Sequence, residues 1–258
     1  MGEFTGKVVL ITGASSGIGA ETALHFAAEG AGLALVGRDE GRLEKSAKDC
    51  MVKGLAKDKV LTIKADMCVE DDVKRIVEST ITHFGRLDVL VNNAGGSIPC
   101  FLTSEDLMKN YDRIVKLNVR SVIQLTNLAT THLIASKGSV VNVSSVCGKR
   151  VMAGMLLPYN ISKAAVDQFT RCAALELASK GVRVNAVNPG TIMTPIKLKY
   201  GKSEEEVRER ASKTHPMGRA GETNEVAPAI KFLASNAASF ITGETLSIDG
   251  GRHVACAR

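Results

Sequence analysis

The sequence is poor in aromatic residues, which make up 4% of its 258 positions, and it contains no tryptophan. Platforms that stack the bases of single-stranded nucleic acids depend on such side chains. The 33 lysines and arginines exceed the 27 acidic residues, giving a net charge of +6, but no run of five or more like charges occurs. A mildly basic, solvated surface explains this balance, and we expect no nucleic-acid partner.

Long apolar runs are also missing. No stretch approaches the roughly 18 apolar residues that cross a bilayer, so we expect no membrane segment. The opening residues, MGEFTGK, do not resemble a secretory leader. The six cysteines show no metal-ligand spacing, so we expect no metal site, and we interpret them as reduced thiols of a cytoplasmic protein.

The most informative stretch that is present is VVLITGASSGIG at residues 8–19. Its unbroken apolar run predicts a strand buried on both faces, and Gly13, Gly17 and Gly19 follow before a helical pattern begins. Glycines let the backbone approach a diphosphate, and the free N–H groups of the first helical turn point at it. The spacing differs from the usual dinucleotide fingerprint, so a purely structural turn is the alternative for this stretch alone.

Strand and helix patterns alternate along the whole chain. They predict an α/β fold, with a single doubly wound, Rossmann-like parallel sheet of about seven strands and helices on both faces, forming one domain over residues 1–258. The expected strands are 7–12, 32–36, 60–64, 87–91, 139–143, 182–187 and 244–248. The expected helices are 17–29, 40–53, 70–84, 103–135, 158–179, a short one from 203, and 223–234, with capping boxes at Thr103/Asp106 and Ser203/Glu206.

Several motifs together resemble the short-chain dehydrogenase/reductase family over nearly the whole length. They are TGASSGIG at 12–19, NNAG at 92–95, Asn118 in KLNV, Ser145 in VSSVCG, YNISK at 159–163, NPG at 188–190, PMGRAG at 216–221 and IDGGRH at 248–253. The resemblance is strongest to the branch with 3-ketoacyl-carrier-protein reductases and animal carbonyl and hydroxysteroid dehydrogenases. The separation of Ser145 and Tyr159 is longer than usual for the family, which predicts a loop bulging toward the substrate.

The resemblance implies a catalytic tetrad of Asn118, Ser145, Tyr159 and Lys163. Tyr159 and Lys163 are four residues apart on a predicted helix and therefore share one face. By resemblance, Tyr159 passes the proton, Lys163 lowers its pKa, Ser145 holds the substrate oxygen, and Asn118 holds a water that relays protons. Without the resemblance, Tyr159 and Lys163 would be interpreted as surface residues, and Asn118 as a buried amide whose hydrogen bonds are all made.

The resemblance also implies a dinucleotide site at the carboxyl ends of the strands. In it, Asn92, Ala94 and Gly95 would form the adenosine-side wall, Ile192 and Thr194 would hold the carboxamide, and Asp66 would bind adenine unless it caps the next helix. The full expected set is Gly13, Ser15, Ser16, Gly17, Ile18, Gly19, Arg38, Asp66, Asn92, Ala94, Gly95, Tyr159, Lys163, Pro189, Gly190, Ile192 and Thr194.

Gly37, Arg38 and Asp39 bear on the choice between NADP and NAD. An acid about 20 residues beyond the glycines accepts the ribose 2′-OH, whereas an arginine meets a 2′-phosphate. Asp39 has that spacing, but Gly37 stands where the family's NAD enzymes often carry an acid, and Asp39 suits a helix cap. We predict NADP (NADPH) as the cofactor, with NAD as the less favoured choice.

The substrate side is expected to comprise a lid over 193–221 and the facing loop 147–157. Val151, Met152, Met155, Leu156 and Leu157 suggest an apolar pocket, while Lys149 and Arg150 are expected to be solvated rather than to meet an acidic tail. We predict reduction or oxidation of a lipophilic small-molecule carbonyl or alcohol. The alternatives are an NAD-dependent alcohol or hydroxysteroid dehydrogenase and a non-catalytic nucleotide sensor. The resemblance further implies a homo-oligomer, either a dimer or a tetramer.

Overall fold

The computed structural model describes residues 2–152, 156–194 and 203–255. Within them, seven strands form one sheet in the order β3-β2-β1-β4-β5-β6-β7, and every pairing is parallel. The strands are β1 (Val8–Thr12), β2 (Gly32–Gly37), β3 (Val60–Lys64), β4 (Val89–Asn92), β5 (Ser139–Val143), β6 (Arg183–Pro189) and β7 (Thr245–Ile248). The chain winds outward from β1 to β3 and then in the other direction from β4 to β7, which confirms the doubly wound, Rossmann-like prediction.

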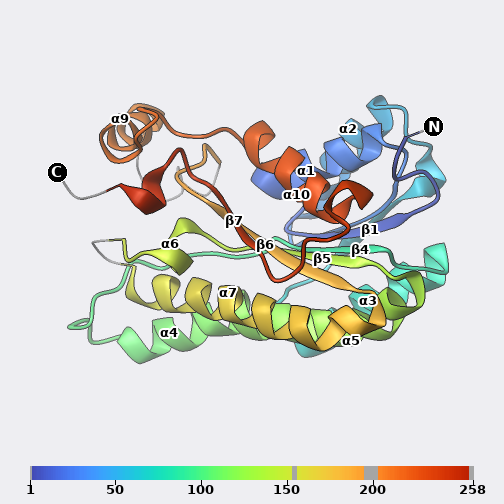
Figure 1. Cartoon of the computed structure of the whole chain (residues 1–258), viewed down its shortest axis with the longest axis horizontal. Coiled ribbons are helices and arrows are strands. Elements are labelled where there is room, and N and C mark those ends of the chain that lie inside the picture. Colours follow the sequence, from blue (N-terminus) through green and yellow to red (C-terminus); the bar gives the residue numbers. More distant parts are fainter. Residues whose placement is uncertain (1, 153–155, 195–202, 256–258) are drawn as a thin grey trace.

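Helices cover both faces of this sheet (Figure 1). One layer holds α1 (Gly17–Ala28), α2 (Glu40–Val52) and α10 (Thr223–Ala234), and the other holds α3 (Glu70–Phe84), α4 (Leu107–Val115), α5 (Ser121–Ser136) and α7 (Leu157–Leu177). The short α6 (Val146–Lys149) and α9 (Glu204–Thr214) lie near the carboxyl ends of the strands. Short 3-10 turns occupy Lys57–Lys59, Ala178–Lys180, Asn236–Ala238 and Arg252–Val254.

The central strand β1 explains why its sequence is apolar without interruption. Successive side chains of a strand point to opposite faces, and both faces of this one are covered. Val9 and Ile11 join the core beneath α1 and α10, whereas Val8 and Leu10 join the core beneath α3 and α5. Burying each of these side chains stabilises the fold by about 1.5–3 kcal/mol, so a polar residue at any of them would be costly.

The helix expected over 103–135 differs from the structure in its start and its continuity. It begins at Leu107, and a π-helical stretch, Lys116–Arg120, separates α4 from α5. The predicted Thr103/Asp106 capping box is wrong, because Asp106 is itself the N-cap and Ser104 Oγ instead accepts from the Phe101 N–H at 2.9 Å. A π turn accommodates one extra residue, and Asn118 lies in it.

Two other predicted helix starts are confirmed. The Ser203/Glu206 capping box begins α9, and Asp39 caps α2 by accepting from the Arg42 N–H. The helix α6 was not predicted. Among the helices of the described residues, none has the length and apolar character that spanning a bilayer requires.

Candidate active site

A cavity of about 1390 Å³ opens at the carboxyl ends of the strands. Its wall contains sixteen of the predicted site residues: Gly13, Ser15, Ser16, Gly17, Ile18, Arg38, Asp66, Ala94, Gly95, Ser145, Tyr159, Lys163, Pro189, Gly190, Ile192 and Thr194. Three predicted residues, Gly19, Asn92 and Asn118, lie outside the wall that the described residues form. The side chains expected to handle the cofactor and those expected to do the chemistry therefore face one space.

The glycine turn after β1 fits the close approach of an anionic ligand. Gly13 and Gly17 have φ values of +67° and +58°, which L side chains rarely adopt. Ser16 is the N-cap of α1, and among the described residues no backbone N–H donates a capping hydrogen bond to its side chain. The first N–H groups of α1 thus face the cavity at the positive end of the helix dipole, where a diphosphate binds favourably.

Gly19 is not part of the cavity wall, but it packs against the glycine turn on the side away from the cavity. A Cβ at this position would overlap the Gly13 carbonyl oxygen and the Asn93 side chain, so only glycine lets α1 pack against the turn. Sequence reasoning missed Asn93. Its Nδ2 donates to the carbonyl oxygens of Thr12 (2.8 Å) and Gly13 (3.2 Å), which fixes the turn to the loop after β4.

The assignment of Asn92 to the adenosine-side wall is wrong. Asn92 is the last residue of β4, and strand alternation sends its side chain into the core instead of the cavity. Its Nδ2 donates to Thr126 Oγ1 at 3.0 Å and to Asn142 Oδ1 at 2.9 Å. Asn92 thereby ties β4 to β5 and α5, and the wall at this point consists of Asn93, Ala94 and Gly95.

At the far end of the cavity, two guanidinium groups flank the end of β2. Arg38 and Arg42 both line the cavity, and Arg42 was not predicted. Asp39 accepts from the N–H of Arg42 (3.0 Å) and from its Nε (2.7 Å), and these hydrogen bonds lower the pKa of its carboxyl. Asp66 accepts from the Cys68 N–H at 2.9 Å, while Val69 is the N-cap of α3, so Asp66 does not cap that helix.

The predicted catalytic pair stands on α7, which starts with Pro158 in its first turn. Lys163 Nζ lies 5.7 Å from the centre of the Tyr159 ring and donates to the Val143 carbonyl oxygen at 2.8 Å. The Lys163 side chain is buried, and this burial lowers its pKa from 10.5 to about 8, against a smaller opposing effect of Asp167. A change of charge at Lys163 is therefore accessible near neutral pH.

Ser145 and Asn118 complete the predicted tetrad in different ways. Ser145 faces the cavity and caps α6, its Oγ accepting from the Cys147 N–H at 3.2 Å. Asn118 lies behind the wall, where it accepts from the Gly96 N–H (3.0 Å) and donates to the Gly96 carbonyl (2.9 Å) and Ser162 Oγ (3.0 Å). It thus joins the loop after β4 to α7, which supports both Gly95 and Lys163.

Comparison with known proteins identifies the family of this chain. The family model described as enoyl-(acyl carrier protein) reductase matches residues 13–253. The chain is 41% identical over 251 residues to glucose 1-dehydrogenase of Gluconobacter oxydans, covering 96% of this chain and 92% of that protein. It is 40% identical to 3-oxoacyl-[acyl-carrier-protein] reductase of Thermotoga maritima, covering 95% and 97%. The chain belongs to the short-chain dehydrogenase/reductase family.

A solved member of this family has nearly the same fold. It is a short-chain dehydrogenase/reductase of unknown function from Caenorhabditis elegans, crystallised with cofactor. It superposes with a TM-score of 0.92 at 38% identity, over 99% of this chain and 98% of the other. The protein is accordingly an NAD(P)-dependent oxidoreductase that acts on CH–OH groups or carbonyls.

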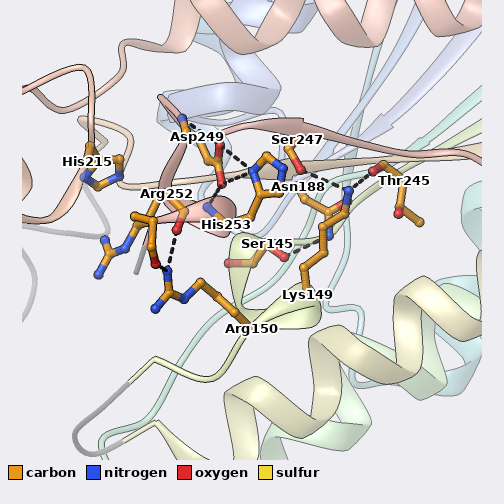
Figure 2. Close-up of polar contacts among 12 residues, drawn as sticks. Ser145, Lys149, Arg150, Asn188, His215, Thr245, Ser247, Asp249, Arg252 and His253 are labelled. Carbon is orange, nitrogen blue, oxygen red and sulfur yellow. Dashed lines mark hydrogen bonds and ion pairs between the residues drawn. The ribbon is translucent and has the colours of Figure 1, made fainter. Parts of the chain in front are cut away.

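In the present chain, the buried carboxyl group of Asp167 lies behind the active-site wall, and sequence analysis did not predict it. Asn188 Nδ2 donates at 2.8 Å both to the Ser145 carbonyl oxygen and to Asp167 Oδ2, and Figure 2 shows the bond between Asn188 and Ser145. Burial raises the pKa of Asp167. A Cβ at Gly148 would overlap the Asp167 carboxylate, so this side chain is packed tightly under the turn that carries Ser145. The only sequence signal for it is an acid four residues after Lys163.

The loop expected to enclose the substrate is anchored to the C-terminal turn. Lys149 donates to Ser247 Oγ at 2.9 Å and to the Thr245 carbonyl, and Arg150 Nη1 donates to the carbonyls of Arg252 (2.5 Å) and Ala255 (2.7 Å) (Figure 2). Lys149 is exposed, as predicted, but both cations also donate hydrogen bonds that hold the loop against β7 and the residues after it, which the prediction of solvation did not include.

Part of the expected apolar pocket is present. Met152 and Leu156 line the cavity, but Val151 is 79% exposed and Leu157 is not in the wall. Met155 lies outside the described residues, as does the middle of the bulge expected between Ser145 and Tyr159. Of the expected lid, Thr194 and the α9 residues Val207 and Arg210 line the cavity, whereas residues 195–202 lie outside the described residues.

Proposed function

We propose that this protein is an NADP(H)-dependent reductase or dehydrogenase that interconverts a ketone or aldehyde with the corresponding alcohol on a lipophilic small molecule. The observation that carries the proposal is the convergence of Ser145, Tyr159 and Lys163 on the cavity that also contains the glycine turn. Bound NADPH would supply the hydride for reduction, and the chain's own residues would manage the proton.

In this proposal, Ser145 Oγ orients the substrate oxygen and Tyr159 Oη donates the proton to it. A tyrosine with an ordinary pKa of about 10 requires roughly 4 kcal/mol to titrate near pH 7. One positive charge at about 5 Å supplies around 3 kcal/mol at an effective dielectric constant of 20. Lys163 Nζ lies 5.7 Å from the centre of the Tyr159 ring, so its charge is close to the phenol, and the positive nicotinamide ring of bound NADP would add to its effect.

The preference for NADP rests on the end of β2. Gly37 offers no carboxylate to a ribose 2′-OH, and a Cβ there would already come within 3.2 Å of Ser15 Oγ. The carboxylate of Asp39 is engaged by Arg42, so it is directed toward its own helix. Arg38 has a 68% exposed side chain at the cavity, and with Arg42 it offers the guanidinium donors that suit a 2′-phosphate.

The substrate end supports a partly apolar molecule. Pro99, Leu117, Met152, Leu156 and Ile192 contribute to the cavity wall near the catalytic residues. Methionine in such a wall adapts to irregular ligands. These side chains are the basis for proposing a lipophilic body beside the reacting carbonyl.

Assembly and location are also proposals. Ile123 on α5 and Ile161 and Leu175 on α7 expose 42%, 45% and 85% of their surface, which supports a homodimer or homotetramer formed through this helical layer. Light scattering of the purified protein tests this. The reduced thiols of Cys50, Cys68, Cys100 and Cys172 support a cytoplasmic location.

A panel of ketones, aldehydes and alcohols tests the proposed function. Turnover is followed by the absorbance of the reduced nicotinamide, with NADPH and NADH in parallel. We expect reduction of several lipophilic ketones with a preference for NADPH. Tight NADPH binding without turnover on any compound would instead indicate a nucleotide-sensing protein, and equal efficiency with both cofactors would contradict the proposed cofactor choice.

A further inference from the structure

The substrate end of the cavity contains a buried cation that the mechanism does not use. Arg252, in the turn after β7, is 8% exposed and lines the cavity. Its Nη1 donates to Thr191 Oγ1 at 3.0 Å, and Thr191 is held from its other side by its N–H bond to His215 Nε2 at 3.0 Å. Figure 2 shows Arg252 at this turn, with its carbonyl oxygen bonded to Arg150.

No carboxylate of the described residues forms an ion pair with Arg252. Asp249, the acid in the same turn, accepts instead from the N–H groups of Gly251 and His253. The undescribed segments of the sequence contain no Asp or Glu. Burial, together with the charges of Arg210 and Arg150, lowers the pKa of Arg252, against smaller opposing effects of Cys147 and of the Asp249 carboxylate, which does not pair with it directly. A buried guanidinium without an anion is costly, and a bound anion would relieve that cost.

A second cation faces the same space. Arg210 on α9 lines the cavity, and it too forms no ion pair with a described carboxylate. Its neighbours on that helix behave differently, because Arg208 pairs with Glu222 at 3.0 Å and Lys213 pairs with Glu209 at 2.6 Å. Of these three cations on α9, Arg210 lines the cavity and has no acidic partner among the described residues.

Cys147 relates this pair of arginines to the reaction centre. It follows Ser145 by two residues, lines the cavity, and lies close enough to both Lys163 and Arg252 to influence the pKa of each. A molecule that binds Ser145 and Tyr159 through its carbonyl and extends past Cys147 would bring its other end to Arg252, because all four residues line the same cavity. In that orientation, an acidic group at the other end of the molecule would meet the arginines.

We infer that the substrate is an anion, an oxo acid or the matching hydroxy acid, whose carboxylate is bound by Arg252 and Arg210. This inference rests on the proposed function and narrows its substrate class. The apolar side chains of the wall would contact the carbon chain between the two ends. Arginine suits the role because its planar donors bind a carboxylate through two parallel hydrogen bonds.

The test compares oxo acids with their methyl esters, starting with acetoacetate and levulinate and continuing to longer chains. The ester keeps the carbonyl and the carbon chain but removes the negative charge. We expect the wild-type kcat/KM for the preferred acid to exceed that for its ester by about 10- to 100-fold, the usual range for a hydrogen bond to a charged group. Arg252→Met and Arg210→Met should each reduce this ratio, and Arg252→Lys should restore part of it. Arg208→Met, on the same helix but outside the cavity wall, should leave it unchanged.

Direct binding separates failure of this inference from failure of the proposed function. Titration of levulinate and a longer oxo acid into the NADP-loaded protein is followed by calorimetry, with Arg210→Met as the variant least able to disturb folding, because its side chain is exposed. Arginine-dependent binding without turnover of any carbonyl would overturn the proposed reaction and keep the anion site. A wild-type kcat/KM for the ester that equals or exceeds that for the acid would overturn the anion site and keep the reaction. A loss of kcat/KM in Arg252→Met that is the same for the acid and for the ester would do so as well.

Discussion

The ammonium nitrogen of Lys163 lies 2.8 Å from the carbonyl oxygen of Val143 and 5.7 Å from the centre of the Tyr159 ring. The end of β5 thus holds a buried cation beside the phenol that we propose as proton donor. The arrangement stabilises an ionised phenol by its charge, and it costs folding energy because that charge is removed from water. Lys163 consequently links activity to stability in a way that can be measured.

Lys163→Met should change how stability depends on pH. The pKa of Lys163 is about 8 in the folded protein and 10.5 when exposed, so between these values the unfolded state binds more protons and the free energy of unfolding rises with pH. Relative to Lys163→Met, the wild type should gain about 3 kcal/mol between pH 7 and pH 10.5. Urea unfolding measures this, and the exposed Lys48→Met serves as the control. A difference between wild type and Lys163→Met that does not vary with pH would show that the lysine is not desolvated.

Arg38→Ala should lower kcat/KM for NADPH by about 10- to 100-fold, because a charged hydrogen bond to the 2′-phosphate is lost. The value for NADH should change little, since that cofactor has no phosphate there. Lys64→Ala is a matched control, because Lys64 is an exposed cation near the same strand ends that pairs with Glu40 at 3.2 Å. Equal losses with the two cofactors would contradict the assignment of Arg38 to the phosphate.

Asn118→Ala should destabilise the protein by about 1–3 kcal/mol, because the partly buried N–H and carbonyl of Gly96 lose their partner. It should also lower kcat, since the loop after β4 and α7 would no longer be tied together beside Lys163. Thermal unfolding and turnover of the same preparation measure both effects. The exposed Asn127→Ala, on α5, controls for loss of an amide from a helix, and comparable behaviour of the two variants would count against a positioning role for Asn118.

The sequence was a reliable guide where local pattern and burial agree. The apolar run of β1 and the glycines after it predict a covered strand and a phosphate turn, because each residue's environment follows from its position in a regular element. Asp39 as a helix cap is predictable for the same reason, since its partner Arg42 is only three residues away.

The features that the sequence did not predict depend on contacts between residues far apart along the chain. In the π-helical turn, Asn118 bonds to Gly96 and Ser162, which are far away along the chain. At the end of β4, the phase of the strand determines which of two adjacent asparagines enters the core, and sequence alone did not give that phase. Arg150 is held by carbonyls about one hundred residues later, so its interaction with the C-terminal turn could not be inferred locally.

Turnover of the best ketone of the panel by Tyr159→Phe, with NADPH at neutral pH, tests the central claim most directly. The variant keeps the ring and loses only the hydroxyl, so its melting temperature should stay close to that of the wild type. Tyr111→Phe, on α4 and outside the cavity wall, should behave like the wild type. The proposed proton transfer predicts a fall in kcat of about 10²- to 10⁴-fold for Tyr159→Phe. Undiminished turnover by this variant would contradict it.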